Sequence, residues 1–163
     1  MKNLILLLFL IPFLSANSQE RKTNFWSEVR FGGSFGLGFG NNITTIAVSP
    51  SAIYDFNPFF SAGIQIGYQY SKRNDFSSNV FSSGILGMFN PFDRIQLSSE
   101  FEQLFVNQKI GSDCSSYNYP ALYLGGAYRV NANISLGFRY DILFNRDKSI
   151  YASAISPIFR VFF

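Results

Sequence analysis

The sequence predicts an all-β protein, an eight-stranded antiparallel transmembrane β-barrel. Between Trp26 and Phe163, apolar residues alternate with small or polar ones, which is the period of a strand with two different faces. Clusters of Asn, Pro and Gly interrupt this alternation and mark turns. Hydrophobic residues make up 47% of the chain and charged residues 14%, against roughly 25% charged residues in ordinary soluble domains.

The first 18 residues have the pattern of a cleavable signal peptide. Lys2 precedes an apolar run from Leu4 to Leu14, and small residues follow in Ala16-Asn17-Ser18, so cleavage is expected before Gln19. This run is shorter than the roughly 20 apolar residues of a transmembrane helix. We therefore expect a signal peptide at 1–18, an N-terminal tail at 19–25, a barrel domain at 26–163, and export to the cell outer membrane.

Eight strands account for the mature chain. A tilted strand that crosses a bilayer needs about 9–11 residues, and each expected strand is long enough. We expect strands near 26–39, 43–56, 59–71, 79–89, 94–106, 119–130, 133–145 and 150–163.

The expected connections alternate between short and long. Tight turns are predicted at Asn57-Pro58, Asn90–Asp93 and Asn131–Asn133, and longer polar loops at Lys72–Ser78 and Asn107–Asn118. Shorter outer loops at Gly40–Asn42 and Asn145–Ser149 complete the set. Outer-membrane barrels have short turns on the periplasmic rim and longer loops on the outer rim.

Three prolines fall within or beside the expected strands. Proline cannot donate a hydrogen bond to a strand ladder, so each needs a bulge or a strand end. We expect Pro120 to start a strand, and Pro50 and Pro157 to mark bulges or the membrane edge of tilted strands.

Charged residues recur on the faces that we assign to the barrel interior. In the fifth strand, Ile95, Leu97, Phe101 and Phe105 alternate with Gln96, Ser98, Glu100 and Glu102. Unpaired buried charges are costly, so opposite charges in a narrow lumen should pair. An eight-stranded barrel is just wide enough to be filled by side chains, which predicts a plugged lumen. The expected lumen ion-pair network comprises Glu28, Arg30, Asp55, Glu100, Glu102, Arg129, Arg139, Asp141 and Arg160.

Alternation alone also fits a soluble barrel with the apolar faces inside. The leading hypothesis is an outer-membrane barrel with a structural or surface-interaction role, the alternative is a soluble periplasmic barrel that binds a small apolar ligand, and the third is an enzyme. Glu100 and Glu102 share a strand face and could serve acid–base chemistry, but ion pairing with the nearby arginines is the expected role.

Several other classes of function lack the residues that they need. The chain contains no histidine, which excludes Ser-His-Asp and Cys-His nucleophiles and histidine-ligated metal sites. Without Lys2, the 13 basic residues become 12 against 10 acidic ones, a balance that does not favour nucleic acid. The single cysteine, Cys114, is expected to be a free thiol or an intermolecular partner in an outer loop. We therefore expect no cofactor, no metal and no catalytic residues.

The terminal alternation Phe159-x-Val161-x-Phe163 resembles the signal that the barrel assembly machinery reads. By hairpin layout and by this motif, residues 26–163 resemble small outer-membrane β-barrel proteins of the OmpX and OmpA-transmembrane type. This resemblance implies outer-membrane lipids and the barrel assembly machinery as partners, and leaves any partner of the outer loops open.

Three stretches resemble short exported chains that are sometimes labelled 2-oxoglutarate decarboxylase. They are Phe31–Leu37, Ser49–Tyr54 and Asp147–Ala152. Thiamine-dependent decarboxylases resemble large α/β enzymes with a Gly-Asp-Gly metal motif, and this chain has no such tripeptide. We therefore expect no decarboxylase activity.

Overall fold

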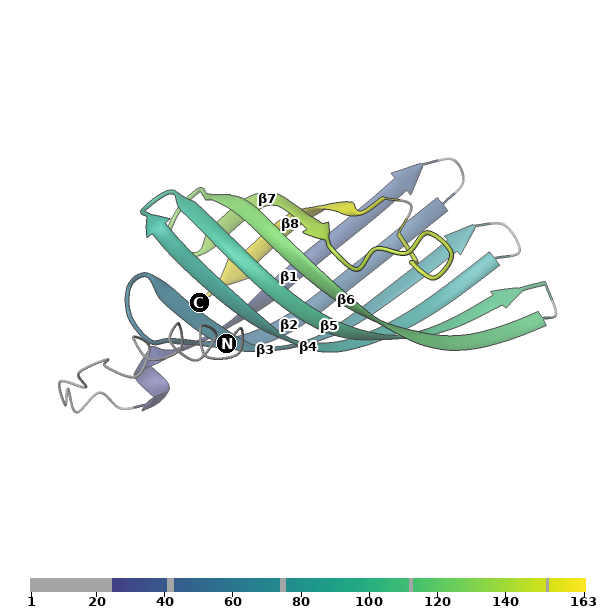
Figure 1. Ribbon diagram of the computed structural model, residues 1–163, viewed down its shortest axis with the longest axis horizontal. Coiled ribbons are helices and arrows are strands. Elements are labelled where there is room, and N and C mark those ends of the chain that lie inside the picture. Colours follow the sequence, from purple (N-terminus) through teal and green to yellow (C-terminus); the bar gives the residue numbers. More distant parts are fainter. Residues whose placement is uncertain (1–24, 41–42, 74–75, 112, 152) are drawn as a thin grey trace, which may run out of the picture.

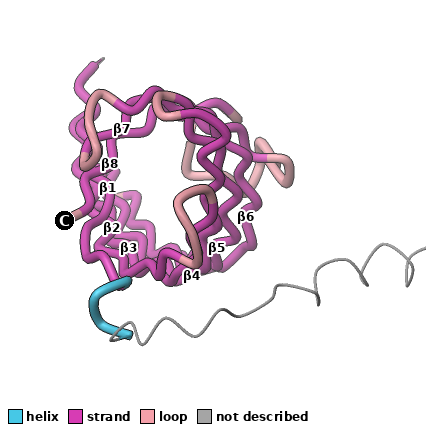
Figure 2. The backbone as a smooth tube through the Cα atoms, turned by 90° about the vertical axis from the view of Figure 1, so that its left-hand side faces the viewer, coloured by secondary structure: helices cyan, strands magenta, loops and turns pink. Residues whose placement is uncertain are grey.

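A computed structural model describes residues 25–163, apart from 41–42, 74–75, 112 and 152. The predicted signal peptide and residues 19–24 of the predicted tail lie outside the described residues. The chain forms a closed barrel in which each strand pairs antiparallel with its neighbour in sequence and β8 returns to β1 (Figures 1 and 2). The predicted eight-stranded antiparallel barrel is confirmed.

A short 3-10 helix, η2 (Phe25–Glu28), leads into the first strand. The strands are β1 (Val29–Gly40), β2 (Ile43–Asp55), β3 (Phe60–Arg73), β4 (Phe76–Phe92), β5 (Ile95–Ile110), β6 (Asp113–Arg129), β7 (Ile134–Asp141) and β8 (Ile155–Phe162). No helix in the described part of the chain is long and apolar enough to cross a bilayer.

The tight turns lie at one end of the barrel, which we call the terminal end because it also carries Phe163 (Figure 1). The Asn57 side-chain oxygen accepts the backbone N–H groups of Phe59 and Phe60, each at 2.9 Å. Asn131 does the same for residues 133 and 134, each at 2.8 Å. An asparagine that bonds the backbone two residues on stabilises a turn locally, which is why these two turns were predictable.

The predicted turn at Asn90–Asp93 is displaced. Asn90 is buried, and β4 continues to Phe92 through a shift of register between Phe89 and Phe92. The turn itself is formed by Asp93 and Arg94. Pro91 therefore lies in a bulged strand end, a position that needs no backbone donor.

The opposite end, which we call the loop end, differs most from prediction. Much of the predicted loops 72–78 and 107–118 is strand, because β4, β5 and β6 continue pairing far beyond their apolar segments. Gly111 adopts φ 59° at the β5–β6 connection, a left-handed conformation that favours glycine. Cys114 accordingly lies exposed in β6, opposite Lys109, and not in a loop.

The last loop is longer than predicted. Strands expected at 133–145 and 150–163 shorten to β7 and β8, which leaves 142–154 as the connection. The Asp141 carboxylate ends β7 by accepting the backbone N–H groups of Leu122 (3.3 Å) and Leu143 (3.0 Å). This carboxylate takes the place of a strand partner for these two N–H groups. The apolar–polar alternation of the residues after Asp141 therefore does not correspond to a strand.

Pro120 does not start a strand, contrary to expectation. It lies within β6 opposite Gln103, and Pro50 and Pro157 likewise lie within β2 and β8. All three are exposed on the outer face of the barrel. The β2–β3 ladder pairs Val48 with Tyr68 and then Ser51 with Gln65, so it passes Pro50 without a change of register.

Side chains alternate between the lumen and the outer surface along the strands. The predicted facing of β5 is confirmed, with Gln96, Ser98, Glu100 and Glu102 buried and Phe101 exposed. Two apolar clusters fill parts of the lumen. One, toward the terminal end, contains Ile53, Leu86, Met88 and Phe162, and the other, toward the loop end, contains Val80, Leu104, Val106, Tyr119, Ala121 and Tyr123.

Candidate functional site

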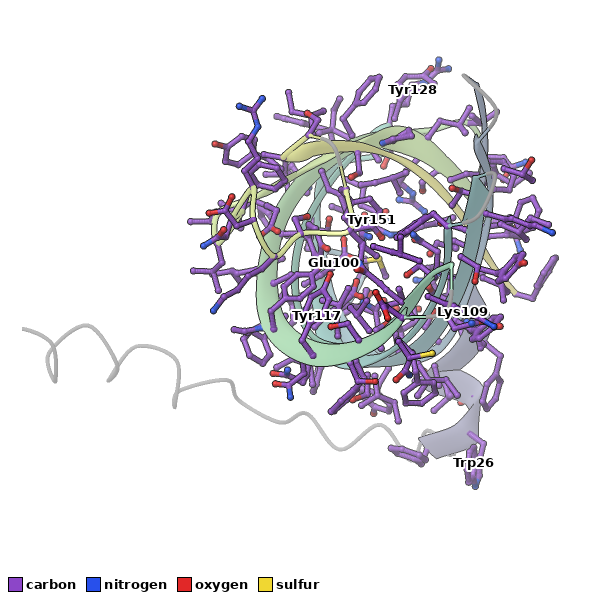
Figure 3. The ribbon with its side chains drawn as sticks, turned by 90° about the vertical axis from the view of Figure 1, so that its right-hand side faces the viewer. Trp26, Glu100, Lys109, Tyr117, Tyr128 and Tyr151 are labelled. Carbon is purple, nitrogen blue, oxygen red and sulfur yellow. The ribbon has the colours of Figure 1, made fainter. Side chains whose placement is uncertain are left out.

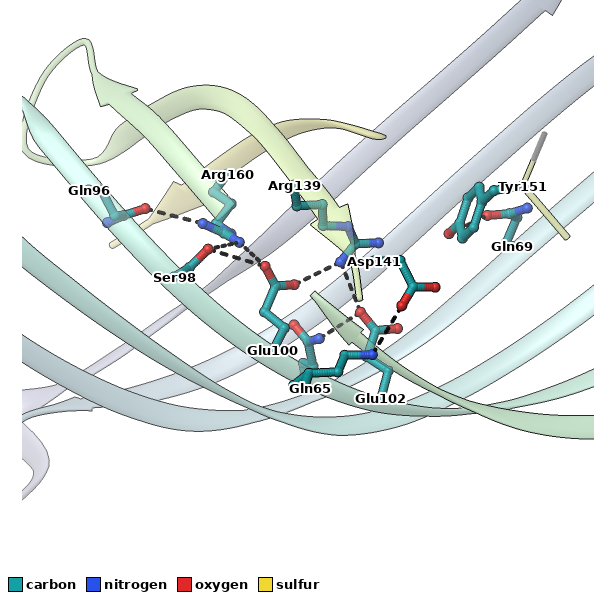
Figure 4. A network of polar contacts seen from close by, with 11 residues as sticks. Gln65, Gln69, Gln96, Ser98, Glu100, Glu102, Arg139, Asp141, Tyr151 and Arg160 are labelled. Carbon is teal, nitrogen blue, oxygen red and sulfur yellow. Dashed lines mark hydrogen bonds and ion pairs between the residues drawn. The ribbon is translucent and has the colours of Figure 1, made fainter. Parts of the chain in front are cut away.

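The candidate site is a group of four charged side chains in the middle of the lumen (Figure 4). Glu100 and Glu102 extend from β5, Arg139 from β7 and Arg160 from β8. Arg139 donates to Glu100 at 2.7 Å and to Glu102 at 2.9 Å. Arg160 pairs with the other oxygen of Glu100. Two carboxylates and two guanidinium groups therefore form one electrically balanced cluster.

Neutral polar groups complete this cluster. Gln65 of β3 donates to Glu102 at 2.9 Å. Arg160 also donates to Gln96 at 3.3 Å and to Ser98 at 3.1 Å. The chain of contacts from Gln65 through Glu102 to Arg139 joins β3 to β7, which stand four strands apart in a ring of eight and so face each other. The cluster thus connects opposite walls of the barrel.

Arg139 has an aromatic partner as well. Its guanidinium carbon lies 3.9 Å from the ring centre of Tyr123, which is fully buried. A cation over an aromatic face is attracted by the ring quadrupole, and more strongly when water is excluded. This contact and the two carboxylates hold Arg139 in one orientation.

A second ion pair lies toward the terminal end. Arg30 of β1 donates to the two carboxylate oxygens of Asp55 in β2 at 2.6 and 2.9 Å. Ser61 of β3 donates to the same carboxylate. Side-chain exposures of 28% and 26% show that water reaches this pair, so it contributes less to the stability of the fold than the central cluster does.

The loop 142–154 folds over the opening at the loop end. Ile150 and Tyr151 pack against the apolar cluster that contains Leu104 and Tyr119. The backbone N–H of Ile150 donates to the Tyr119 hydroxyl at 3.1 Å, and Tyr151 donates to Gln69 of β3 at 3.2 Å. Seen from the loop end, Tyr151 and Glu100 lie within the ring of strands, whereas Trp26 and Tyr128 point away from it (Figure 3). Burial raises the pKa of the Tyr151 hydroxyl, so it remains a donor.

Three residues of the expected network stand apart from these pairs. Within the described chain, Glu28, Arg129 and Asp141 form no ion pair. Glu28 belongs to η2, before the first strand, and Arg129 ends β6 at the terminal end. Asp141 is buried, but backbone N–H groups and not arginines satisfy its carboxylate. Glu28 was expected in the lumen because the first strand was predicted to begin too early, whereas Arg129 lies in its expected strand, at the end of β6.

Sequence reasoning missed the contribution of the last loop. Tyr151 was expected in a strand, so nothing in the alternation pointed to a side chain that turns back into the lumen. Gln65 and Gln69 could have been found, since they occupy alternate positions of one strand and so share its inward face. Tyr119, the first residue of the strand expected at 119–130, is buried inside the barrel.

The described residues hold no group of three or more His, Cys, Asp or Glu side chains that could ligate a metal. The two carboxylates that are close in space, those of Glu100 and Glu102, are occupied by arginines. Acid–base catalysis needs a group that can exchange a proton with a substrate, and each of these carboxylates is engaged in an ion pair.

The predicted terminal motif lies along the seam where the barrel closes. Phe159, Val161 and Phe163 share the outer face of β8 and the residue after it, while Arg160 and Phe162 point inward. Phe163 exchanges backbone hydrogen bonds with Phe31 of β1 at 2.9 and 3.2 Å.

No protein-family model and no curated protein matches the chain. Among solved structures, it is similar to Ail, the attachment invasion locus protein of Yersinia pestis, with 12% identity and a TM-score of 0.47 over 82% of this chain and 91% of that chain. It is also similar to Neisserial surface protein A, with 16% identity and a TM-score of 0.45 over 83% and 94%. A de novo designed transmembrane β-barrel gives 16% identity and a TM-score of 0.42 over 83% and 92%.

Proposed function

We propose that this chain is an outer-membrane β-barrel protein with a structural or surface-interaction role and no catalytic activity. The observation that carries the proposal is that polar side chains lie inside the barrel and apolar ones outside, the reverse of a soluble protein. Glu100 is 2% exposed and Arg160 4%, whereas Ile64 and Phe138 on the outer face are 66% and 65% exposed. A soluble barrel that binds an apolar ligand would have the opposite arrangement.

The outer surface is apolar over most of the barrel. Contiguous exposed apolar patches larger than a few hundred Å² are rare in soluble monomers and mark contacts with membranes or partners. The exposed apolar side chains along the strands include Phe31, Phe35, Ile46, Val48, Ile64, Ile66, Phe81, Ile85, Leu97, Phe101, Phe105, Leu124, Leu136, Phe138, Ile155 and Phe159. A lipid bilayer covers such a belt on all sides, which a single protein partner does not.

Aromatic side chains gather at the terminal end of this belt. Phe25 stacks on Tyr54 with ring centres 5.1 Å apart, and Phe56 contacts both Tyr54 (5.0 Å) and Phe60 (5.7 Å). Girdles of aromatic residues at the bilayer interface are typical of transmembrane barrels. Because the tight turns also lie at this end, and outer-membrane barrels have their short turns on the periplasmic side, we assign the terminal end to the periplasmic interface.

The lumen is proposed to be plugged and not a pore. The central cluster joins opposite walls, and Ile150 and Tyr151 cover the interior from the loop end. An eight-stranded barrel is narrow enough for side chains to fill it. The polar side chains of the lumen therefore connect the walls of the barrel and stabilise the fold.

A surface-interaction role is supported by the long hairpin of β5 and β6. Their last paired residues, Ile110 and Asp113, extend well past the apolar belt, and exposed polar side chains such as Lys109 and Ser116 cover this extension. No residue there identifies a partner.

The proposal of no catalysis extends to 2-oxo acid decarboxylation. That reaction needs an electron sink, which is supplied by thiamine, pyridoxal or a Schiff-base lysine. Lys72, Lys109 and Lys148 are exposed at the loop end, so none of them lies in an enclosed site for a carbonyl substrate. Lys22 lies outside the described residues.

We expect the folded protein to be heat-modifiable on a gel. A closed barrel pairs its backbone polar groups internally and resists detergent until it is heated. Unheated samples in SDS should migrate differently from boiled ones, and the protein should fractionate with outer membranes. Identical mobility together with recovery in the soluble periplasmic fraction would contradict the proposal and support the soluble alternative.

Deleting Phe163 should reduce assembly into the outer membrane strongly. Phe163 is the last residue of the proposed assembly signal and forms two backbone hydrogen bonds that close the barrel. The measurement is the amount of heat-modifiable protein in the outer-membrane fraction. Deletion of residues 19–23 is the control, because this polar segment precedes the barrel. Equal yields of the two variants would remove the assembly-signal proposal.

A further inference from the structure

The seam between β1 and β8 is sealed over only part of its length. The described pairs are Gly32 with Phe162, Gly33 with Val161, and Ser34 with Arg160. A side chain could not be added at Gly32, since its Cβ would lie 2.1 Å from the carbonyl oxygen of Val161. Beyond Ser34 the described residues of the two strands form no further pair, although β8 extends back to Ile155 and β1 on to Gly40.

A cavity of about 390 Å³ lies beside the part of the seam where these residues form no pair. Its inner wall combines the apolar side chains of Val80, Leu104, Ile150 and Ile158 with the polar side chains of Ser49, Gln69 and Ser82. The opposite wall has small side chains, such as Gly36 and Ala47, which is why space remains there. For comparison, an apolar cavity of roughly 150 Å³ is enough to bind benzene.

The cavity reaches the outer surface of the barrel through the seam. Its lining includes Phe35 of β1 and Pro157 and Phe159 of β8. These three side chains point outward and are exposed, in contrast to the inward Ile158 and Arg160 between them. The opening is therefore framed by the same apolar belt that we assign to the bilayer.

The chemistry of the lining favours an apolar occupant. The charged residues at its floor, Glu100, Glu102, Arg139 and Arg160, are paired with one another. Among the described residues, the buried side-chain polar atoms without a partner are those of Ser78 and Tyr123, and neither residue lines the cavity. Backbone that is not strand-paired is tolerated at membrane depth where it lines a cavity.

We propose that this cavity is a lateral binding site for an acyl chain of a membrane lipid, which enters from the bilayer between β1 and β8. The proposal rests on the membrane location argued above. The lipid's chain lies along Leu104 and Ile158 while its head group stays at the interface of the loop end.

The test uses tryptophan fluorescence in vesicles that contain phospholipids brominated along their acyl chains. Trp26 is the single tryptophan and is replaced by phenylalanine in every variant. Leu104→Trp reports on the cavity, Phe162→Trp on the sealed part of the lumen, and Phe101→Trp on the outer face. Heat-modifiability on a gel verifies that each variant is folded.

We expect quenching of Leu104→Trp comparable to that of Phe101→Trp, and several-fold greater than that of Phe162→Trp. Adding Ala47→Phe, which fills the cavity, should bring the quenching of Leu104→Trp down to the level of Phe162→Trp. Quenching of Leu104→Trp no greater than that of Phe162→Trp, with Phe101→Trp strongly quenched, would overturn the lateral site alone. An unquenched Phe101→Trp would instead contradict the membrane location itself.

Discussion

Replacing Arg139 with methionine should lower the free energy of unfolding by about 3–5 kcal/mol, the usual cost of leaving a buried charge without its partner. The substitution leaves Glu100 and Glu102 with Arg160 as their remaining cation, and it also removes the contact with the Tyr123 ring. The measurement is urea unfolding of the purified protein, refolded in lipid vesicles and followed by gel mobility.

A second substitution separates lost charge balance from lost packing. Arg139→Met combined with Glu102→Gln restores a neutral cluster, so the double variant should recover part of the stability. Arg94→Met is the matched control, because Arg94 is exposed in a turn and its guanidinium interacts with the exposed Tyr128. Equal losses for Arg139→Met and Arg94→Met would show that the central cluster does not brace the barrel.

The second large effect is expected on the outer face, where an arginine in place of Ile85 should cost about 2–4 kcal/mol if that position faces the bilayer midplane. Ile85 lies midway along β4, between Ile64 of β3 and Phe101 of β5, in a row of exposed apolar side chains. An exposed position in a soluble protein would tolerate a charge without such a loss.

Depth in the membrane supplies the control for this substitution. Phe92 is also exposed but lies beside the turn at the terminal end, and an arginine near the interface costs about 0–1 kcal/mol. Unfolding in vesicles should therefore distinguish Ile85→Arg from Phe92→Arg. If Ile85→Arg were as stable as the unmodified protein, the lipid-facing assignment would be wrong.

The alternation of side chains was enough to predict the fold and most of the facing. On β5, the period of two places Glu100 and Glu102 in the lumen and Phe101 outside. Because a slip of one residue would turn every side chain to the other face, the need to bury one face also sets the register with the neighbouring strands. Turns stabilised by their own asparagine, as at Asn57, were predictable because the stabilising contact is local.

Features that depend on contacts distant in sequence were not predictable. The end of β7 is set by Asp141, which bonds to the backbone of Leu122 on the adjacent strand, and Tyr151 enters the lumen to meet Gln69. At the loop end, β5 and β6 are polar, and the sequence predicted these residues as a loop. The two strands nevertheless pair with each other up to Ile110 and Asp113. Composition describes the preference of a segment, whereas pairing with a neighbour decides its conformation.

The central claim, that lipid surrounds the apolar face and the charged face is sealed inside, is tested most directly by spin labels along β5 of the protein in vesicles. Single cysteines in a Cys114→Ser background place nitroxides at Leu97, Ser99, Phe101 and Phe105 on the outer face, and at Ser98 and Val106 in the lumen. We expect the outer labels to collide often with oxygen, which concentrates in the bilayer, and rarely with a water-soluble nickel complex. The lumen labels should be protected from both reagents. Frequent collisions of the outer labels with the nickel complex would contradict the account and place the apolar face in water.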